Sequence, residues 1–146
     1  MKENIKIGII GLGQRGDIML ENPIIPMMKN GAGIEITAVC DLLPDRVSAA
    51  AEKLEKVGFP RPTELTDYKE LLKIKELDAV YIAVSWEAHA EVAVAAMHAG
   101  KYVGLEAGGA YSIDDCCKLV RAYEETGTEL MLMENCCYGR RELMVL

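Results

Sequence analysis

Short apolar runs rich in β-branched residues alternate with helical patterns along the whole chain. The runs are almost continuous in apolar residues and lack polar alternation, which is typical of strands covered on both faces in a parallel sheet. They predict five clear strands and a weaker sixth. The clear strands are Ile5–Ile10, Ile34–Cys40, Ala79–Val84, Tyr102–Leu105 and Glu129–Met133, and the weaker one lies near Arg61–Thr63.

Amphipathic helices are predicted between these strands, because apolar residues recur there at helical spacing. Gly58, Gly100 and Gly127 follow three of the apolar stripes, as is typical of the residue just past a helix. Pro23 is expected to interrupt the first helix. The stripes are Val47, Ala50, Ala51, Leu54 and Val57; Tyr68, Leu71 and Leu72 after Asp67; Ala88, Val92, Ala95, Ala96 and Ala99; and Cys116, Leu119, Val120 and Tyr123 after a Ser112–Asp115 capping box.

The alternation of strands and helices predicts an α/β fold, namely a doubly wound parallel sheet with right-handed crossovers. A length of 146 residues fits one domain with a substantial core. The net charge of −7 argues against nucleic acid or an anionic membrane as a partner. No apolar run approaches the roughly 20 residues of a membrane helix. The first strand also begins too early for a signal peptide, so we expect a cytoplasmic protein.

The five cysteines, Cys40, Cys116, Cys117, Cys136 and Cys137, include two adjacent pairs. Adjacent pairs are a poor disulfide framework, and neither a CxxC nor a Cys/His metal spacing is present, so no metal site is predicted. We expect reduced thiols that serve as small core residues. A redox centre at the second pair is the alternative, and the backbone strain of such a bridge argues against it.

A glycine-rich segment, Gly11-Leu12-Gly13-Gln14-Arg15-Gly16, directly follows the first strand and precedes a helix. In a dinucleotide-binding turn, Gly11 would permit the tight turn, Gly13 would let a pyrophosphate approach the backbone, and Gly16 would allow close packing of helix on strand. Free N–H groups at the helix start would receive the phosphates. A glycine turn without a ligand is the alternative.

An acidic residue, Asp41, ends the second strand. A carboxylate in this place accepts hydrogen bonds from the adenosine ribose and repels a 2′-phosphate. Leu42 and Leu43 come next, and Arg46 is expected inside the following helix, so the sequence favours NAD over NADP. A helix-capping role for Asp41 before Pro44 is compatible with the ribose role.

A third motif follows the strand at Ala79–Val84 and opens an alanine-rich helix that ends in Ala-Gly-Lys. With the motifs around it, the chain resembles the glucose–fructose oxidoreductase/inositol dehydrogenase (Gfo/Idh/MocA) family over essentially its whole length. The resemblance implies a Rossmann dinucleotide-binding fold. Residues 1–146 would be the NAD-binding domain of a two-domain enzyme, with the family's C-terminal substrate domain absent from this chain. The motifs, in the family's order, are the glycine segment, Asp41, Thr66-Asp67-Tyr68, Ser85-Trp86-Glu87-Ala88-His89, Gly100-Lys101 and Glu106.

The resemblance also implies roles for single residues. Ser85 and Trp86 would line the cofactor between its adenine and nicotinamide ends, and His89 would lie near the ribose-phosphate. A polar helix-start residue without a ligand is the alternative for His89. The family has Glu-Lys-Pro where this chain has Glu-Ala-Gly. Glu106 is kept as a cofactor residue, but the lysine that assists substrate binding and proton transfer is replaced by Ala107.

The segment after the fifth strand is expected to reach the same cleft. Asn135 offers amide donors and acceptors to the cofactor. Tyr138 and Arg140 are the candidates to touch a polar substrate or to replace the missing proton carrier. Because a polar helix start with solvated arginines explains these residues equally well, the catalytic residues stay unknown.

Three functions are compatible with these features. The first is an NAD-dependent oxidoreductase acting on a sugar, polyol or related carbohydrate. The second is an NAD-dependent glycosidase that oxidises a sugar carbon transiently, and the third is a non-catalytic NAD-binding or redox-sensing module. Without the lysine and a second domain, the chain alone is expected to bind NAD without turnover. Uncovered apolar residues at Met131, Met133 and Leu143–Leu146 predict a homo-oligomer.

Overall fold

The computed structural model of the chain describes residues 4–135, 137 and 139–145. Every predicted strand forms, and each begins within two residues of its predicted start. The elements in chain order are β1 (Ile5–Ile10), α1 (Gln14–Met19), the π-helical turn η1 (Leu20–Ile24), α2 (Ile25–Lys29), β2 (Ile34–Cys40), α3 (Pro44–Lys56), β3 (Thr63–Leu65), α4 (Tyr68–Leu72), β4 (Ala79–Ile82), α5 (Trp86–His98), β5 (Tyr102–Glu106), α6 (Ile113–Thr126), β6 (Leu130–Met133) and α7 (Arg140–Leu143).

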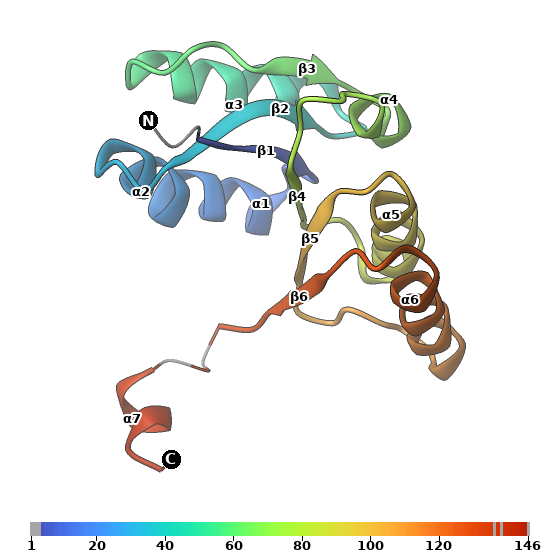
Figure 1. Ribbon diagram of the computed structural model, residues 1–146. Coiled ribbons are helices and arrows are strands. Elements are labelled where there is room, and N and C mark those ends of the chain that lie inside the picture. The colour runs from blue at the N-terminus through green and yellow to red at the C-terminus, as the bar shows by residue number, and fades with distance from the viewer. Residues whose placement is uncertain (1–3, 136, 138, 146) are drawn as a thin grey trace.

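The strands pair in parallel as one sheet with the order β3-β2-β1-β4-β5-β6 (Figure 1). The chain builds outward from β1 to β3 and then crosses back to place β4 on the other side of β1. The predicted doubly wound parallel sheet is therefore confirmed. The strand order reverses between β1 and β4, and a ligand of an open α/β sheet binds at the carboxyl edge of such a reversal.

Each face of the sheet has its own apolar core. The helical layer of α1, η1, α2 and α3 covers one face, and α4, α5 and α6 cover the other (Figure 1). Adjacent residues of β1 show the alternation, because Ile9 packs into the first core and Ile10 into the second. The central strands are thus covered on both faces, which explains why their sequences are apolar without interruption.

The capping residues act as local chemistry predicts. At the start of α4, Asp67 Oδ1 accepts a hydrogen bond from Lys69 N at 2.8 Å. At the start of α6, Ser112 Oγ accepts one from Asp115 N at 3.1 Å. Helix α6 ends at Gly127, whose φ of +66° lies in the left-handed region that favours glycine.

Pro23 and α6 differ from the expectation. Pro23 does not end the helical path, because it lies inside η1, and a π-helical turn accommodates a residue that lacks its N–H. In α6 the predicted apolar face is largely exposed. Val120 and Tyr123 are about half exposed, and Ala122 is the buried residue, because the helix packs mainly on α5 at the end of its layer.

The expectation that the cysteines are core residues is right for Cys40 and wrong for three others. Cys40 is buried at the end of β2, whereas Cys116, Cys117 and Cys137 are exposed. The first two lie on the solvent side of α6, which the described residues leave uncovered. Cys136 lies outside the described residues.

The outer side of the sheet at β6 is uncovered. Met131 and Leu132 are about half exposed, and Met133 is half-buried. Beyond them α7 stands apart from the sheet in Figure 1, and residues 143–145 are exposed. The described residues thus leave apolar side chains exposed on β6 and at residues 143–145, as the sequence predicted. No helix in the described ranges has both the length and the apolar character needed to cross a membrane.

Candidate functional site

The loops after β1, β2, β4, β5 and β6 lie along one edge of the sheet, because parallel strands all end at the same edge. These loops carry the glycine turn (residues 11–16) and most of the other candidate residues. The structure therefore gathers side chains that are far apart in the sequence. The candidates at this edge are Asp41, Ser85 and Asn135 on the loops, Glu106 at the last position of β5 and Trp86 at the first position of α5.

Two glycines of the turn are required by the packing of the protein itself. Gly11 has a φ of +94°, and a Cβ there would overlap the carbonyl group of Ala83. A Cβ on Gly16 would overlap the carbonyl oxygen of Gly11, because α1 starts directly against the end of β1. These two positions therefore have a structural reason to be glycine that is independent of any ligand.

Gly13 is different. Its φ of −65° and ψ of −171° suit any residue, and a Cβ there would lie no closer than 3.7 Å to a protein atom, Arg46 Nη1. Nothing in the described part of the chain demands a glycine here, whereas a group that approaches the backbone from outside would. Helix α1 has no side-chain cap, so its first N–H groups are available to an anion. The turn fits a dinucleotide pyrophosphate.

Asp41 holds this turn from the end of β2. Its Oδ2 accepts a hydrogen bond from Leu12 N at 2.7 Å, and its Oδ1 accepts one from Leu43 N at 2.9 Å. The side chain of Leu12 is buried, so Leu12 can offer a ligand only its backbone. Each carboxylate oxygen still has a lone pair for an outside donor such as a ribose hydroxyl.

Arg46 lies close to Asp41 and forms an ion pair with it. It lies in the first turn of α3, and its Nη1 is 3.7 Å from Asp41 Oδ2. In the sequence the arginine is five positions from the acid and has no assigned role. The turn of α3 brings the two charges together, so the predicted adenosine end of the site carries a positive as well as a negative group.

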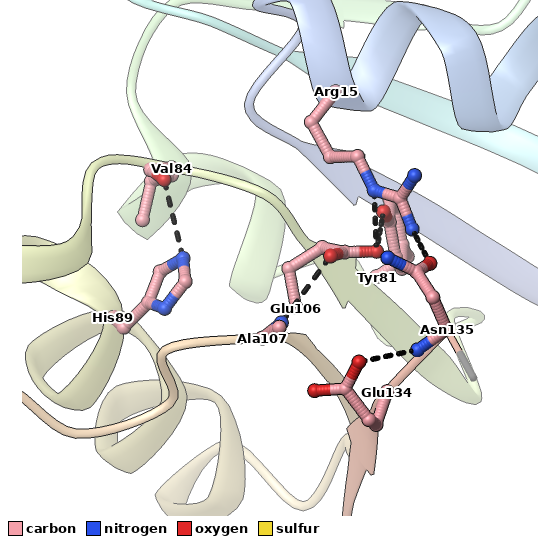
Figure 2. A network of polar contacts seen from close by, with 8 residues as sticks. All are labelled: Arg15, Tyr81, Val84, His89, Glu106, Ala107, Glu134 and Asn135. Atoms are coloured by element: carbon pink, nitrogen blue, oxygen red, sulfur yellow. Dashed lines mark hydrogen bonds and ion pairs between the residues drawn. The ribbon is translucent and has the colours of Figure 1, made fainter. Parts of the chain in front are cut away.

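A polar network lies where β4, β5 and β6 end, with Tyr81 and Glu106 buried and Asn135 exposed (Figure 2). Glu106 is only 6% exposed, and its Oε1 accepts a hydrogen bond from the Tyr81 hydroxyl at 2.7 Å. The same oxygen is 3.0 Å from Arg15 Nε, an ion pair in which this N–H is not aligned for a hydrogen bond. Arg15 Nη2 donates to Asn135 Oδ1. Arg15 therefore connects α1 with the segments after β5 and β6.

Tyr81 is the member of this network that the sequence did not single out. Burial, together with the bond to Glu106, raises the pKa of the Tyr81 hydroxyl well above its usual range, so it stays a donor. The other carboxylate oxygen of Glu106 accepts from Ala107 N at 3.2 Å. Glu106 is thus fully engaged, and it orients Arg15 instead of serving as a free base. In the sequence, the feature that could have pointed to Tyr81 is that it is the one tyrosine in an otherwise aliphatic strand.

His89 lies apart from this network, on the side of Val84 (Figure 2). It is 1% exposed, and its Nε2 lies 3.1 Å from the Val84 carbonyl oxygen, so Nε2 carries the proton and donates. Burial lowers the pKa of the imidazole and keeps it neutral. Nδ1 has no partner within the described residues. His89 fixes the start of α5 to the preceding loop, and its place near the ribose-phosphate stays a prediction.

The loop after β5 makes room for an aromatic side chain. Trp86, the first residue of α5, is 60% exposed, and Ser85 before it is also exposed. A Cβ on Gly108 would lie 2.9 Å from the Trp86 ring, and the φ of Gly108 is +90°. The small residues after Glu106 therefore let the loop pass beneath the indole. Ala107 brings no functional group to the edge.

The remaining residues predicted to bind the cofactor or the substrate are exposed, held by other side chains, or far from the sheet. Gln14 is exposed at the start of α1. Asn135, the partner of Arg15, is fixed further because its N–H donates to Glu134 Oε1 at 2.8 Å. Arg140 begins α7 away from the sheet (Figure 1), and Tyr138 lies outside the described residues, so their catalytic roles stay predictions.

The comparisons with known proteins agree with this geometry. The model of an oxidoreductase family with an NAD-binding Rossmann fold, GFO_IDH_MocA, matches residues 5–134. The chain belongs to the Gfo/Idh/MocA family. The predicted family, the Rossmann fold and NAD as the cofactor are thereby confirmed.

One relative and two solved structures show the range of similar proteins. A glycosyl hydrolase family 109 protein from Streptomyces niveus is 38% identical, and the match covers 99% of this chain and 29% of the relative. The WlbA dehydrogenase of Bordetella pertussis, in complex with NADH and UDP-GlcNAcA, has a TM-score of 0.83 at 22% identity, over 98% of this chain and 41% of that one. KijD10, a 3-ketoreductase from Actinomadura kijaniata in complex with TDP-benzene and NADP, has a TM-score of 0.79 at 25% identity, over 98% and 42%. The chain thus spans under a third of the relative's length.

Proposed function

We propose that this chain is the NAD-binding domain of an NAD-dependent glycosidase. The observation that carries the proposal is the 38% identity to a glycosyl hydrolase family 109 protein along almost the entire chain. When bound, NAD supplies a nicotinamide ring that takes a hydride from a sugar carbon and returns it after cleavage, so hydrolysis consumes no cofactor. The substrate class is a glycoside; hydrolysis consumes one water, and the products are the free sugar and the released aglycone.

In this proposal the residues at the carboxyl edge of the sheet bind and orient the cofactor. The backbone of Gly13, Gln14 and Arg15 holds the pyrophosphate at the start of α1. Asp41 accepts hydrogen bonds from the adenosine ribose. Ser85 and Trp86 line the cofactor between its adenine and nicotinamide ends, and His89 lies near the ribose-phosphate, as the family resemblance implies. Glu106 and Asn135 hold Arg15 and so shape the nicotinamide half.

Proton transfer is assigned to residues outside this edge. Glu106 is occupied by three donors or cations, and Ala107 has no ionisable group. Tyr138 and Arg140 remain candidates from this chain. Because the chain spans 29% of its glycosyl hydrolase relative, we propose residues 1–146 as a dinucleotide-binding domain that is followed in the whole protein by a substrate domain carrying the base.

A sugar oxidoreductase with net reduction of NAD is the second candidate. The similarity to KijD10, a 3-ketoreductase, supports it. Both candidates need the cofactor site, so they differ only in the fate of the hydride.

Product analysis of the full-length protein separates these functions. Aryl glycosides are incubated with the protein and NAD, and released phenol and NADH absorbance are followed together. Cleavage without net NADH supports the glycosidase, whereas NADH formed in proportion to oxidised sugar supports the oxidoreductase. NAD binding with neither reaction would leave the non-catalytic module as the function. The Gly13→Val variant is the control, because it should lose either activity with the cofactor.

We also propose that the protein is cytoplasmic and self-associates through the end of the sheet at β6. Free thiols at Cys40, Cys116, Cys117 and Cys137 support a reducing compartment. Exposed Met131 and residues 143–145 support association, since contiguous apolar surface tends to find partners. Light scattering of the purified chain tests the assembly, and a monomer at high concentration would contradict it.

A further inference from the structure

We infer that Arg15 is a positioning residue through which a bound dinucleotide fixes the segment after β6. The inference rests on the proposed function, because it concerns the regulation of the same site. Arg15 is the second residue of α1, so its backbone lies where the pyrophosphate is proposed to bind. Its side chain reaches across the edge of the sheet to Glu106 and to Asn135, which is 120 positions away in the sequence (Figure 2).

Glu106 holds the Arg15 side chain in place. Arg15 Nε lies 3.0 Å from Glu106 Oε1, and Glu106 is buried. The carboxylate is itself fixed, because the Tyr81 hydroxyl donates to it at 2.7 Å and Ala107 N donates to it at 3.2 Å. Movement of Arg15 away from Glu106 would leave a buried charge without its partner, which is strongly unfavourable. Arg15 therefore presents a fixed donor to the segment after β6.

The segment after β6 has few other contacts to hold it. Glu134 and Asn135 are exposed, and so are residues 143–145. Arg15 Nη2 donates to Asn135 Oδ1. Within residues 4–135, 137 and 139–145, no other side-chain hydrogen bond or ion pair joins residues 134–145 to the rest of the protein. The position of this segment therefore depends on the donor that Arg15 supplies.

A dinucleotide acts on this contact through the backbone of the glycine turn. When its pyrophosphate accepts hydrogen bonds from the first N–H groups of α1, the start of that helix frays less. The Arg15 side chain then loses less entropy when it bonds to Asn135, so the bound dinucleotide and the fixed segment favour each other. Such coupling is reciprocal, and loss of the bond to Asn135 weakens dinucleotide binding by the same factor. The segment also carries Arg140, a candidate to touch the substrate.

Hydrogen–deuterium exchange of the full-length protein, with and without saturating NAD, tests this coupling. In wild type, NAD should slow exchange of residues 134–145 about fivefold, and in Arg15→Met and Asn135→Ala by less than about twofold. Asn135→Asp should keep the wild-type protection, because it retains an acceptor for the guanidinium. Arg61→Met is the matched control and should behave as wild type, since Arg61 makes its ion pairs before β3, at the opposite edge of the sheet.

Calorimetry with NAD separates this coupling from a direct contact between Asn135 and the cofactor. By reciprocity, Asn135→Ala should weaken NAD binding about fivefold in the wild-type background and less than about twofold in the Arg15→Met background. An equal loss in both backgrounds would mean a direct contact and would overturn the inference. If Arg15→Met does not fold, Asn135→Ala still decides, because it leaves the ion pair of Arg15 with Glu106 in place. Wild-type protection of residues 134–145 in that variant would overturn the inference.

The outcomes separate the inference from the proposed function. NAD binding to wild type without slower exchange of residues 134–145 would overturn the coupling through Arg15 and leave the proposed NAD site intact. Failure of wild type to bind NAD would overturn the proposed function itself, and the inference with it.

Discussion

Replacing Tyr81 by Phe removes one hydroxyl from the buried part of the polar network and keeps the ring in the core. The hydroxyl donates to Glu106 Oε1 at 2.7 Å, and both residues are 6% exposed, so water cannot take its place. Hydrogen bonds to charged groups contribute roughly 1.5–3 kcal/mol. Arg15 stays 3.0 Å from the same oxygen and limits the loss. We therefore expect the free energy of unfolding to fall by about 2 kcal/mol.

The chain offers a matched control for this change. Tyr68 makes the same kind of contact on the surface, where its hydroxyl donates to Glu91 Oε1 at 2.8 Å. Because water can replace that contact, Tyr68→Phe should cost less than about 1 kcal/mol. Urea denaturation followed by far-UV circular dichroism measures both variants. Equal losses, or a Tyr81→Phe variant as stable as wild type, would refute the role of burial.

The pH dependence of stability gives a second readout of Tyr81. Its pKa in the folded protein is raised above the usual tyrosine value of about 10, chiefly by burial. The folded state therefore holds this proton more tightly than the unfolded state, and stability falls as the pH rises above about 10. Tyr81→Phe should flatten this decline. An identical alkaline slope in wild type and variant would contradict the raised pKa.

Three further predictions follow from buried groups. Burial lowers the pKa of His89, so the unfolded state takes the proton first and the free energy of unfolding falls as the pH drops below about 6.5. In urea denaturation at a series of pH values, His89→Gln should show a smaller fall over this range than wild type. Lys101→Met should lower the free energy of unfolding by about 3 kcal/mol in the same urea assay, because Lys101 Nζ donates to three backbone carbonyls at 2.8–3.3 Å; a loss under about 1 kcal/mol would contradict it. Burial and nearby acids raise the pKa of the Cys40 thiol to about 11, so mass spectrometry after a brief thiol-reagent pulse should find Cys116 and Cys117 modified and Cys40 modified only after unfolding.

The sequence predicted the sheet well because its strands are buried on both faces. β1 and β2 have the predicted bounds, and the order of motifs placed Asp41 and Glu106 at strand ends. Continuous apolar runs and glycine turns are local features, so a single sequence carries them. The same holds for the capping residue Asp67, which bonds to the backbone two positions ahead.

The contacts across the sheet were harder to predict because they join distant segments. Tyr81 and Glu106 are 25 positions apart, and Arg15 and Asn135 are 120 apart. The α6 stripe has helical spacing, yet the periodicity does not say whether a neighbour covers it. The ion pair between Arg46 and Asp41 depends on where α3 begins. The spacing of five positions in the sequence does not by itself predict this contact.

The measurement that bears most directly on the nucleotide site is calorimetry of NAD with wild type and Gly13→Val. The variant should fold, because a Cβ at position 13 meets only Arg46 Nη1 at 3.7 Å, and its circular dichroism spectrum and melting temperature verify this. A side chain there fills the space that a pyrophosphate needs. We expect wild type to bind NAD and the folded variant to show no binding. A folded Gly13→Val variant with unchanged affinity for NAD would place the nucleotide elsewhere and contradict the site at residues 11–16.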